Sequence, residues 1–192
     1  MKDNFIYSIR RERIFVLKSL EKTAVLFVDI INDFHFDGGK ALASNTKEIL
    51  PHLISLREFA KTNALPIIYV NDHYGLWQAD FRKIIDHCYN DASKDIIEAL
   101  QPDDQDYFLI KPQHSAFFQT PLQSLLSELN KDSLIMAGIA GDICILFTAK
   151  DAYMYGYKMH IPENCMASEG KDNNAYALYL LHAVMKADTT AI

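Results

Sequence analysis

Short apolar runs alternate along this chain with stretches in which apolar residues recur at helical spacing. The run TAVLFV at residues 23–28 is apolar after its first threonine, which is typical of a strand that is buried on both faces. The stretch 44–61 instead repeats apolar residues, among them Leu53 and Leu56, near a 3.6-residue period that predicts a helix. The same patterns predict strands over 66–70, 107–110, 133–139 and 157–161, and helices over 95–100, 120–129, 142–155 and 173–186.

This alternation of strands and helices predicts the fold class. Strands that are apolar on both faces and joined through helices form a parallel sheet covered on both sides, because each crossover packs back onto the sheet. We therefore expect an α/β protein, a three-layer α/β/α doubly wound parallel sheet, in a single domain over residues 23–192. Apart from the helix that ends at residue 100, residues 71–106 are predicted to be irregular and to form a wall or lid of a pocket.

Composition narrows the class of protein. The 192 residues are 49% hydrophobic and 23% charged, which suits one globular domain with a full core. The net charge of −6 argues against nucleic-acid or membrane partners, because such surfaces recruit clustered Lys and Arg. No apolar stretch approaches the roughly 18 to 20 residues of a membrane span, and no signal-peptide pattern is present. We therefore expect a cytoplasmic protein.

Residues 1–22 are expected to form an N-terminal arm outside the sheet. They carry apolar side chains that have no obvious place in the predicted strands, namely Phe5, Ile6, Tyr7, Ile9 and Phe15. Such an arm either folds over its own subunit or contacts a second one.

Chemically active residues follow several of the predicted strands. Ligands of open α/β sheets bind outside the carboxyl ends of the strands, so these positions matter most. Asp29 follows the first strand, Asn71 the second and Lys111 the third. Cys144 follows the fourth strand, in the first turn of the next helix, where free N–H groups and the helix dipole favour a thiolate. An acid, a base and a thiol are thus predicted to meet at one edge of the sheet.

Each of these residues also has a plainer interpretation. A lone cysteine is more often a small buried hydrophobic residue, Asp29 could be a turn residue, and Lys111 could be a surface lysine. Their joint placement favours a site in which Asp29 takes the thiol proton and Lys111 adds positive charge. Cys88 and Cys165 lack such neighbours and are interpreted as structural. Three cysteines without C-x-x-C spacing indicate neither a disulfide framework nor a zinc cage.

Four segments together carry a resemblance to a known family. They are VLFVDIINDF (25–34), YVNDHYGLWQADF (69–81), LIKPQHSAFF (109–118) and AGIAGDICILFTAKDAYMYGY (137–157). On these motifs the chain resembles the isochorismatase-like cysteine hydrolases, which include nicotinamidases and N-carbamoylsarcosine amidohydrolases. The resemblance implies a doubly wound domain with sheet order 3-2-1-4-5-6 and a catalytic triad of Asp29, Lys111 and Cys144. It also implies a cis peptide bond between Ile139 and Ala140, with the amides of Ala140 and Cys144 forming an oxyanion hole.

Two departures from the family pattern bear on the chemistry. Nicotinamidases of this family carry an Asp-x-His pair after the second strand, which holds a metal together with a further His. The segment here is Asn71-Asp72-His73, so we expect no catalytic metal, no cofactor and a substrate other than nicotinamide. Isochorismatases proper lack the cysteine nucleophile, which this chain has, and amide hydrolysis is therefore favoured.

The resemblance and the residues at the strand ends together suggest a cysteine hydrolase. It would cleave the C–N bond of a small amide or carbamoyl-type compound through a thioester, with one carboxylate as the base in both halves. Phe34, Trp77 and His114 are candidates to contact a planar substrate, and Asn71 and His73 to bind its polar atoms, although each could equally pack in the core or at the rim. The family also implies a homo-oligomer, either a dimer or a tetramer. The alternatives are an isochorismatase-type or ureido-compound hydrolase and a non-catalytic binding protein on the same fold.

Overall fold

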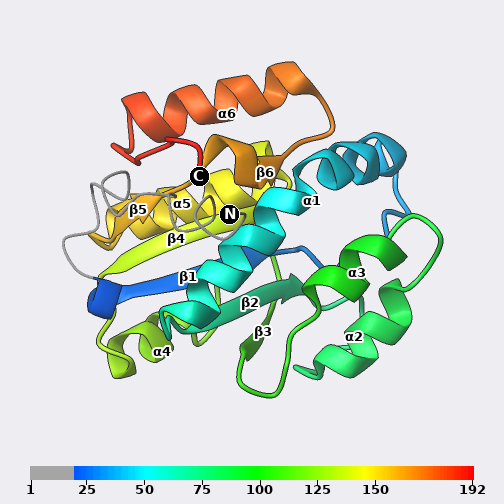
Figure 1. The fold of residues 1–192 in the computed structure, drawn as a ribbon, viewed down its shortest axis with the longest axis horizontal. Coiled ribbons are helices and arrows are strands. Elements are labelled where there is room, and N and C mark those ends of the chain that lie inside the picture. Colours follow the sequence, from blue (N-terminus) through cyan, green and yellow to red (C-terminus); the bar gives the residue numbers. More distant parts are fainter. Residues whose placement is uncertain (1–19) are drawn as a thin grey trace, which may run out of the picture.

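A parallel sheet lies between two layers of helices in the computed structural model, which describes residues 20–192 (Figure 1). Most of the N-terminal arm expected over residues 1–22 therefore lies outside the described residues, and the described chain begins with a short 3-10 turn, η2 (Leu20–Lys22). The strands are β1 (Thr23–Val28), β2 (Ile67–Asp72), β3 (Tyr107–Lys111), β4 (Ser133–Ile139), β5 (Lys158–His160) and β6 (Met166–Ala167). The helices are α1 (Gly39–Thr62), α2 (Phe81–Cys88), α3 (Lys94–Leu100), α4 (Leu122–Glu128), α5 (Leu146–Met154) and α6 (Lys171–Ala183), with a π-helical turn η3 (Gly141–Ile145) before α5 and a 3-10 turn η4 (Glu163–Cys165) before β6.

The sheet order is β3-β2-β1-β4-β5, with all neighbours parallel. The short β6 pairs with the end of β4, at Gly138 and Ile139. The order 3-2-1-4-5-6 was therefore wrong for the sixth strand. Because β5 is only three residues long and pairs with the beginning of β4, the end of β4 is left open for β6. The C-terminal segment lies beyond β5 and pairs with it through a parallel β-bridge between His160 and Asp188.

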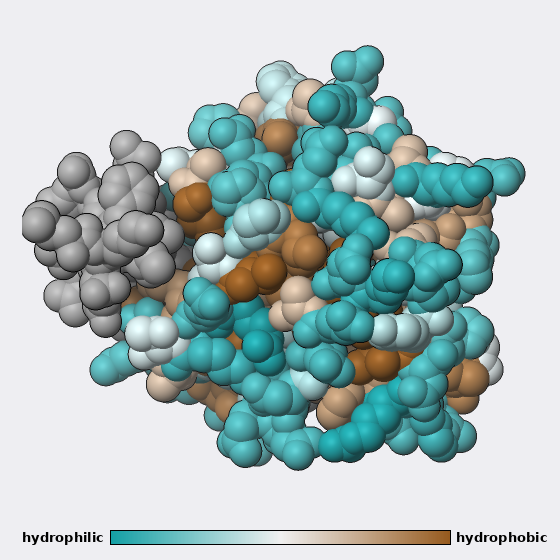
Figure 2. Space-filling view, turned by 45° about the vertical axis from the view of Figure 1, so that its right-hand side comes forward, coloured by the Kyte–Doolittle hydropathy of each residue, from teal (hydrophilic) through white to brown (hydrophobic). Residues whose placement is uncertain are grey.

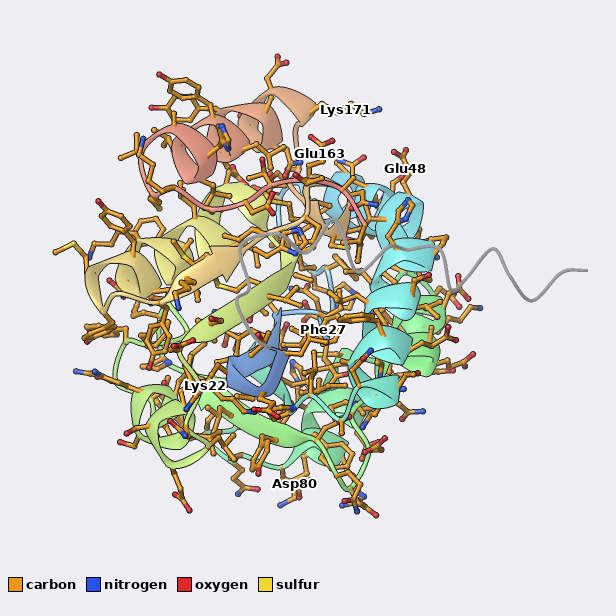
Figure 3. The ribbon with its side chains drawn as sticks, turned by 60° about the vertical axis from the view of Figure 1, so that its left-hand side comes forward. Lys22, Phe27, Glu48, Asp80, Glu163 and Lys171 are labelled. Atoms are coloured by element: carbon orange, nitrogen blue, oxygen red, sulfur yellow. The ribbon has the colours of Figure 1, made fainter. Side chains whose placement is uncertain are left out.

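Alternate residues of the central strands supply two hydrophobic cores. Val25 and Phe27 of β1 belong to the core packed against α1, α2 and α3, where the Phe27 ring stacks on Tyr69 at a centroid distance of 5.3 Å. Leu26 and Val28 belong to the core packed against α4, α5 and α6. Figure 3 shows Phe27 in the interior, between helices on either side. The three-layer α/β/α class predicted from the sequence is thus confirmed.

The predicted limits of the central strands are confirmed, but one predicted helix begins differently. The strands over 23–28 and 133–139 begin and end as expected. The helix predicted over 142–155 starts as the π-helical turn Gly141–Ile145 and continues as α5. Cys144 therefore lies in a turn that is wider than an α-helical one.

The region 71–106 contains a helix that the sequence pattern did not reveal. The prediction that the chain before residue 95 is irregular was wrong, because α2 lies there. Asp80 caps this helix, since its side chain accepts hydrogen bonds from the Arg82 and Lys83 amides at 3.1 and 3.5 Å. Within α2 only Ile84 and Cys88 are buried. Two buried positions one turn apart do not make a recognisable helical period.

Hydrophobic surface is scattered over the molecule. On the face that Figure 2 shows, it is divided into patches by hydrophilic side chains. Within residues 20–192, no helix has both the length and the apolar character needed to cross a bilayer. The expected homo-oligomer and cytoplasmic location stay predictions.

Gly138 marks a close approach between β4 and β1. Its φ is +133°, and a Cβ atom there would meet the Val28 carbonyl oxygen at 2.1 Å. Gly156 also has a positive φ, +80°, but a Cβ atom there would meet nothing within 4 Å. Comparing alanine substitutions at the two glycines therefore separates the cost of the backbone conformation from the cost of the steric contact.

We expect Gly138→Ala to lower the free energy of unfolding by about 2–5 kcal/mol, the sum of left-handed backbone strain and overpacking. Gly156→Ala is the matched control and should lose only the backbone part, about 1–2 kcal/mol. Urea unfolding followed by circular dichroism measures both variants. Equal losses at the two positions would contradict the close approach of Gly138 to Val28.

Candidate active site

Asp29, Lys111 and Cys144 lie in contact at the carboxyl edge of the sheet. Lys111 Nζ is 2.8 Å from Asp29 Oδ2 and donates a hydrogen bond to Cys144 Sγ at 3.6 Å. The three residues are 5%, 2% and 9% exposed, in sequence order. The structure therefore brings together the acid, the base and the thiol that the strand ends predicted at one edge.

The register of the parallel strands explains why these side chains meet. Asp72, the last residue of β2, pairs with Lys111 of β3. The Asp72 amide donates to Asp29 Oδ1 at 2.8 Å, and the Asp29 amide donates to the Val70 carbonyl at 3.0 Å. One carboxylate oxygen of Asp29 is thus held by the β2 backbone and the other by Lys111. This arrangement fixes the orientation of the carboxylate.

Asn71 supports the Asp29 segment and is not available to a substrate. Its side chain is fully buried. Its Nδ2 donates to the Ile31 carbonyl at 2.5 Å and its Oδ1 accepts from the Ile31 amide at 3.4 Å. Both ends of the carboxamide are therefore used to hold the chain two residues after Asp29. Asn71 had been expected to bind polar atoms of the substrate, and these contacts give it a positioning role instead.

Two of the side chains at the end of β2 are engaged by backbone groups of the protein. The Asn71 carboxamide is occupied by Ile31, and His73 Nδ1 accepts from the Gly75 amide at 2.9 Å. Within residues 20–192, no three His, Cys, Asp or Glu side chains converge as metal ligands.

The thiol of Cys144 is held in its neutral form. Burial raises the pKa of this thiol and the charge of Asp29 raises it further, while the charge of Lys111 opposes both without reversing them. Burial would lower the pKa of the Lys111 ammonium, but the charge of the Asp29 carboxylate and the hydrogen bond to it raise the pKa. Burial and the Asp29 charge thus act against the thiolate that the start of the helix was expected to favour, and that effect of the helix stays a prediction. A thiolate would be a second negative charge in a buried site that holds one cation.

The other two cysteines are enclosed in the cores. Cys88 and Cys165 are both fully buried. Burial raises the pKa of each thiol to about 12. Their surroundings agree with the structural role that the sequence suggested.

Among the candidate substrate contacts, His114 lies beside the thiol. Its Nδ1 is 4.0 Å from Cys144 Sγ, and its ring lies 5.5 Å from the ring of Phe147. Phe147 is 49% exposed, and His114 is exposed as well. These two rings therefore form part of the rim next to Cys144.

The other aromatic candidates lie elsewhere around the sheet edge. Phe34 is 4% exposed and packs in the core on the α1 side. His73 and Trp77 stack on each other with ring centroids 3.8 Å apart, and Trp77 is 64% exposed. Within the described part of the chain, none of the three forms a hydrogen bond with the triad. Their contact with a substrate stays a prediction.

Two residues on the face of Cys144 hold the chain that follows Lys111. Thr148 Oγ1 accepts a hydrogen bond from the Ala116 amide at 2.9 Å, and Asp151 Oδ2 accepts from Ser115 Oγ at 2.6 Å. Neither residue was among those predicted from the sequence. A signal was present, because Thr148 and Asp151 follow Cys144 at i+4 and i+7, the spacing of one helical face.

The turn that carries Cys144 begins at a cis peptide bond between Ile139 and Ala140, as the resemblance implies. The Ala140 carbonyl accepts hydrogen bonds from the Ile143 and Ile145 amides, both at 3.1 Å. Ser168 Oγ accepts from the Asp142 amide at 3.1 Å. These hydrogen bonds hold the turn at the Ala140 carbonyl and at the Asp142 amide. An oxyanion hole formed by the Ala140 and Cys144 amides stays a prediction.

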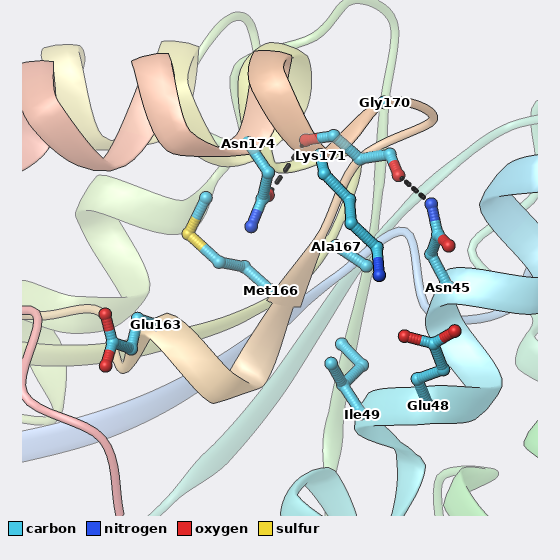
Figure 4. Close-up of a pocket in the computed structure, with 10 residues that line it drawn as sticks. Asn45, Glu48, Ile49, Glu163, Met166, Ala167, Gly170, Lys171 and Asn174 are labelled. Carbon is cyan, nitrogen blue, oxygen red and sulfur yellow. Dashed lines mark hydrogen bonds between the residues drawn. The ribbon is translucent and has the colours of Figure 1, made fainter.

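A pocket of about 170 Å³ lies between α1, β6 and the start of α6 (Figure 4). Its lining includes Asn45, Glu48, Glu163, Lys171 and Asn174. Figure 3 shows Glu48, Glu163 and Lys171 on the same side of the molecule, far from Asp80. The pocket wall also closely approaches the Cys144 turn, because a Cβ atom on Gly141 would meet Asn174 Oδ1 at 2.5 Å. No residue of the predicted site lines this pocket.

We expect Asp29→Asn to speed alkylation of Cys144 at neutral pH and Lys111→Met to slow it. Because the pKa of the thiol is raised, the wild-type alkylation rate should still be rising in the alkaline range. Loss of the carboxylate removes a negative neighbour and shifts this profile to lower pH, whereas loss of the ammonium shifts it to higher pH. Iodoacetamide labelling at a series of pH values, followed by peptide mass mapping, measures the profiles.

Cys144→Ser is the control for labelling at other positions, because Cys88 and Cys165 are enclosed. Asp29→Asn and Lys111→Met profiles that move in the same direction would contradict this account of the thiol.

Comparisons with known proteins agree with the fold and the motifs. The family described as "Isochorismatase domain" matches residues 23–191. The chain is 53% identical over 167 residues to the uncharacterized isochorismatase family protein YaaI of Bacillus subtilis (strain 168), covering 87% of this chain and 92% of that protein. The pyrazinamidase/nicotinamidase of Streptococcus mutans UA159 has a similar structure, with a TM-score of 0.69 and 26% identity over 87% of this chain and 99% of that one. The N-carbamoylsarcosine amidase of Thermoplasma acidophilum shares the fold, with a TM-score of 0.67 and 24% identity over 88% of this chain and 96% of that one. This chain therefore belongs to the isochorismatase family.

Proposed function

We propose that this chain is a cysteine hydrolase that cleaves the C–N bond of a small amide or carbamoyl-type compound through a thioester on Cys144. The observation that carries the proposal is the contact between a thiol, an ammonium and a carboxylate. Lys111 Nζ lies 3.6 Å from Cys144 Sγ and 2.8 Å from Asp29 Oδ2. A thiol with a raised pKa must lose its proton as it attacks a substrate, and Asp29 is the carboxylate placed to accept that proton.

Acylation uses each member of the triad. Asp29 accepts the Cys144 proton as the sulfur attacks the substrate carbonyl, and Lys111 stabilises the negative charge that forms on sulfur. The Ala140 and Cys144 amides bind the oxyanion, a contribution typically of about 10² to 10³ in rate for each donor. Asp29 then gives its proton to the leaving nitrogen, the C–N bond breaks, and the thioester remains. Water hydrolyses the thioester and restores the thiol.

The burial of the charged pair favours catalysis over a purely binding role. Buried charges lower stability unless they are paired with good geometry, and an apolar replacement of similar volume is often neutral or stabilising. A binding protein on the same fold would have no use for a buried ammonium directed at a thiol. The side chains of Lys111 and Asp29 are 2% and 7% exposed. This pair therefore suits a site that moves protons.

We expect wild-type protein to acquire the mass of an acyl group on Cys144 during brief incubation with its substrate. A panel of small amides and N-carbamoyl amino acids, with nicotinamide, a ureido acid and isochorismate added, is followed by intact-protein mass spectrometry and by ammonia release. Cys144→Ala should form no adduct and lose turnover.

The same panel distinguishes the alternatives. Turnover confined to isochorismate or to the ureido acid would favour those hydrolases over an amidase. A Cys144→Ala variant that hydrolyses a panel member as fast as the wild type would overturn the thioester route. Binding of a panel compound without turnover would favour the non-catalytic protein.

A further inference from the structure

The sulfur of Cys144 has neighbours of two kinds. Asp29 and Lys111 are buried, at 5% and 2% exposure. His114 is exposed, yet its Nδ1 lies 4.0 Å from the same sulfur. The acylation step uses the two buried groups and leaves this imidazole without a role.

His114 is held next to the thiol by the chain on both sides of it. Lys111 ends β3 inside the sheet, three residues before His114. On the other side, Ser115 Oγ donates a hydrogen bond to Asp151 Oδ2 at 2.6 Å. The Ala116 amide donates one to Thr148 Oγ1 at 2.9 Å. The imidazole is therefore exposed to solvent while its backbone is anchored to the helix that follows Cys144.

We propose that His114 is the catalytic base of the second half of the reaction, in which water hydrolyses the thioester. This inference rests on the proposed function and replaces the expectation that one carboxylate serves both halves. Water reaches the thioester from the solvent, where His114 lies, whereas Asp29 is enclosed with its oxygens bonded to Lys111 and to the Asp72 amide. An imidazole both accepts and returns a proton near neutral pH.

The proposed step balances without any further reactant. As the water oxygen forms a bond to the thioester carbonyl carbon, one water proton passes to His114. The tetrahedral intermediate then collapses, the C–S bond breaks, and the imidazolium returns its proton to the departing sulfur. The products are the free acid and the neutral thiol of Cys144.

The test uses p-nitrophenyl acetate with the full-length protein, because its leaving group needs no proton and the thioester step is isolated. We expect His114→Gln to keep the initial burst of p-nitrophenol but to lose about 10² or more in the steady-state rate, within the usual range for a general base. Intact-protein mass spectrometry should show the acetylated Cys144 accumulating. Free imidazole should restore steady-state turnover to His114→Ala.

The pH dependence separates a catalytic base from a structural side chain. The wild-type steady-state rate should rise with pH because a general base acts in its unprotonated form, and this rise should be lost in His114→Gln. His52→Gln, which removes an exposed imidazole on α1, is the matched control and should behave as the wild type.

Two results would overturn the role of His114. One is a burst and a steady-state rate that fall by the same factor, and the other is a change in KM alone, which would make His114 a substrate contact. Failure of the proposed function looks different. In that case the wild type forms no adduct at Cys144 with this ester or with the amide panel, and the inference about His114 falls with it.

Discussion

The ion pair between Lys111 and Asp29 is the interaction on which the site depends. Taking two charges out of water costs several kcal/mol for each ion, and the attraction between them offsets this cost only when the geometry is close. The sheet supplies that geometry, because adjacent parallel strands place Lys111 Nζ 2.8 Å from one Asp29 oxygen and the Asp72 amide 2.8 Å from the other. Neither charge can be removed alone without leaving its partner buried and uncompensated.

The ion pair also determines how the thiol can react. One cation faces two groups that can carry negative charge, the Asp29 carboxylate and the Cys144 sulfur. The cation is already matched by Asp29, so ionisation of the thiol to solvent is opposed by burial and by that carboxylate. Transfer of the proton from sulfur to Asp29 keeps the total charge of the site unchanged. Chemistry at this edge is therefore favoured as a proton transfer within the triad over the release of a free thiolate.

The sequence identified the three residues that meet at the edge of the sheet, but not the state of the thiol. Asp29, Lys111 and Cys144 were found because a parallel sheet brings the ends of its strands to one edge, a rule that needs only the order of the elements. The pKa of the Cys144 thiol depends on burial and on distances to two charges, which no spacing in the sequence contains. The role of Asn71 was hidden for the same reason, since its partner Ile31 lies 40 positions away. The pairing of β6 with β4 depends on how soon β5 ends, which hydrophobic patterning does not define.

The helix after Cys144 links the two kinds of neighbour that the sulfur has. Cys144, Thr148 and Asp151 follow one helical face, and the last two bind the segment that carries His114. The helix that follows the Cys144 turn therefore also binds the segment that carries the exposed imidazole, while the sheet holds Asp29 and Lys111. The segment that carries His114 is thus tied to the sheet through Lys111 and to this helix through Ser115 and Ala116. Ile145 and Ala149 lie in the same core as Leu26 and Met136 of the sheet, and this packing holds the Cys144 turn against the strands that position Asp29 and Lys111.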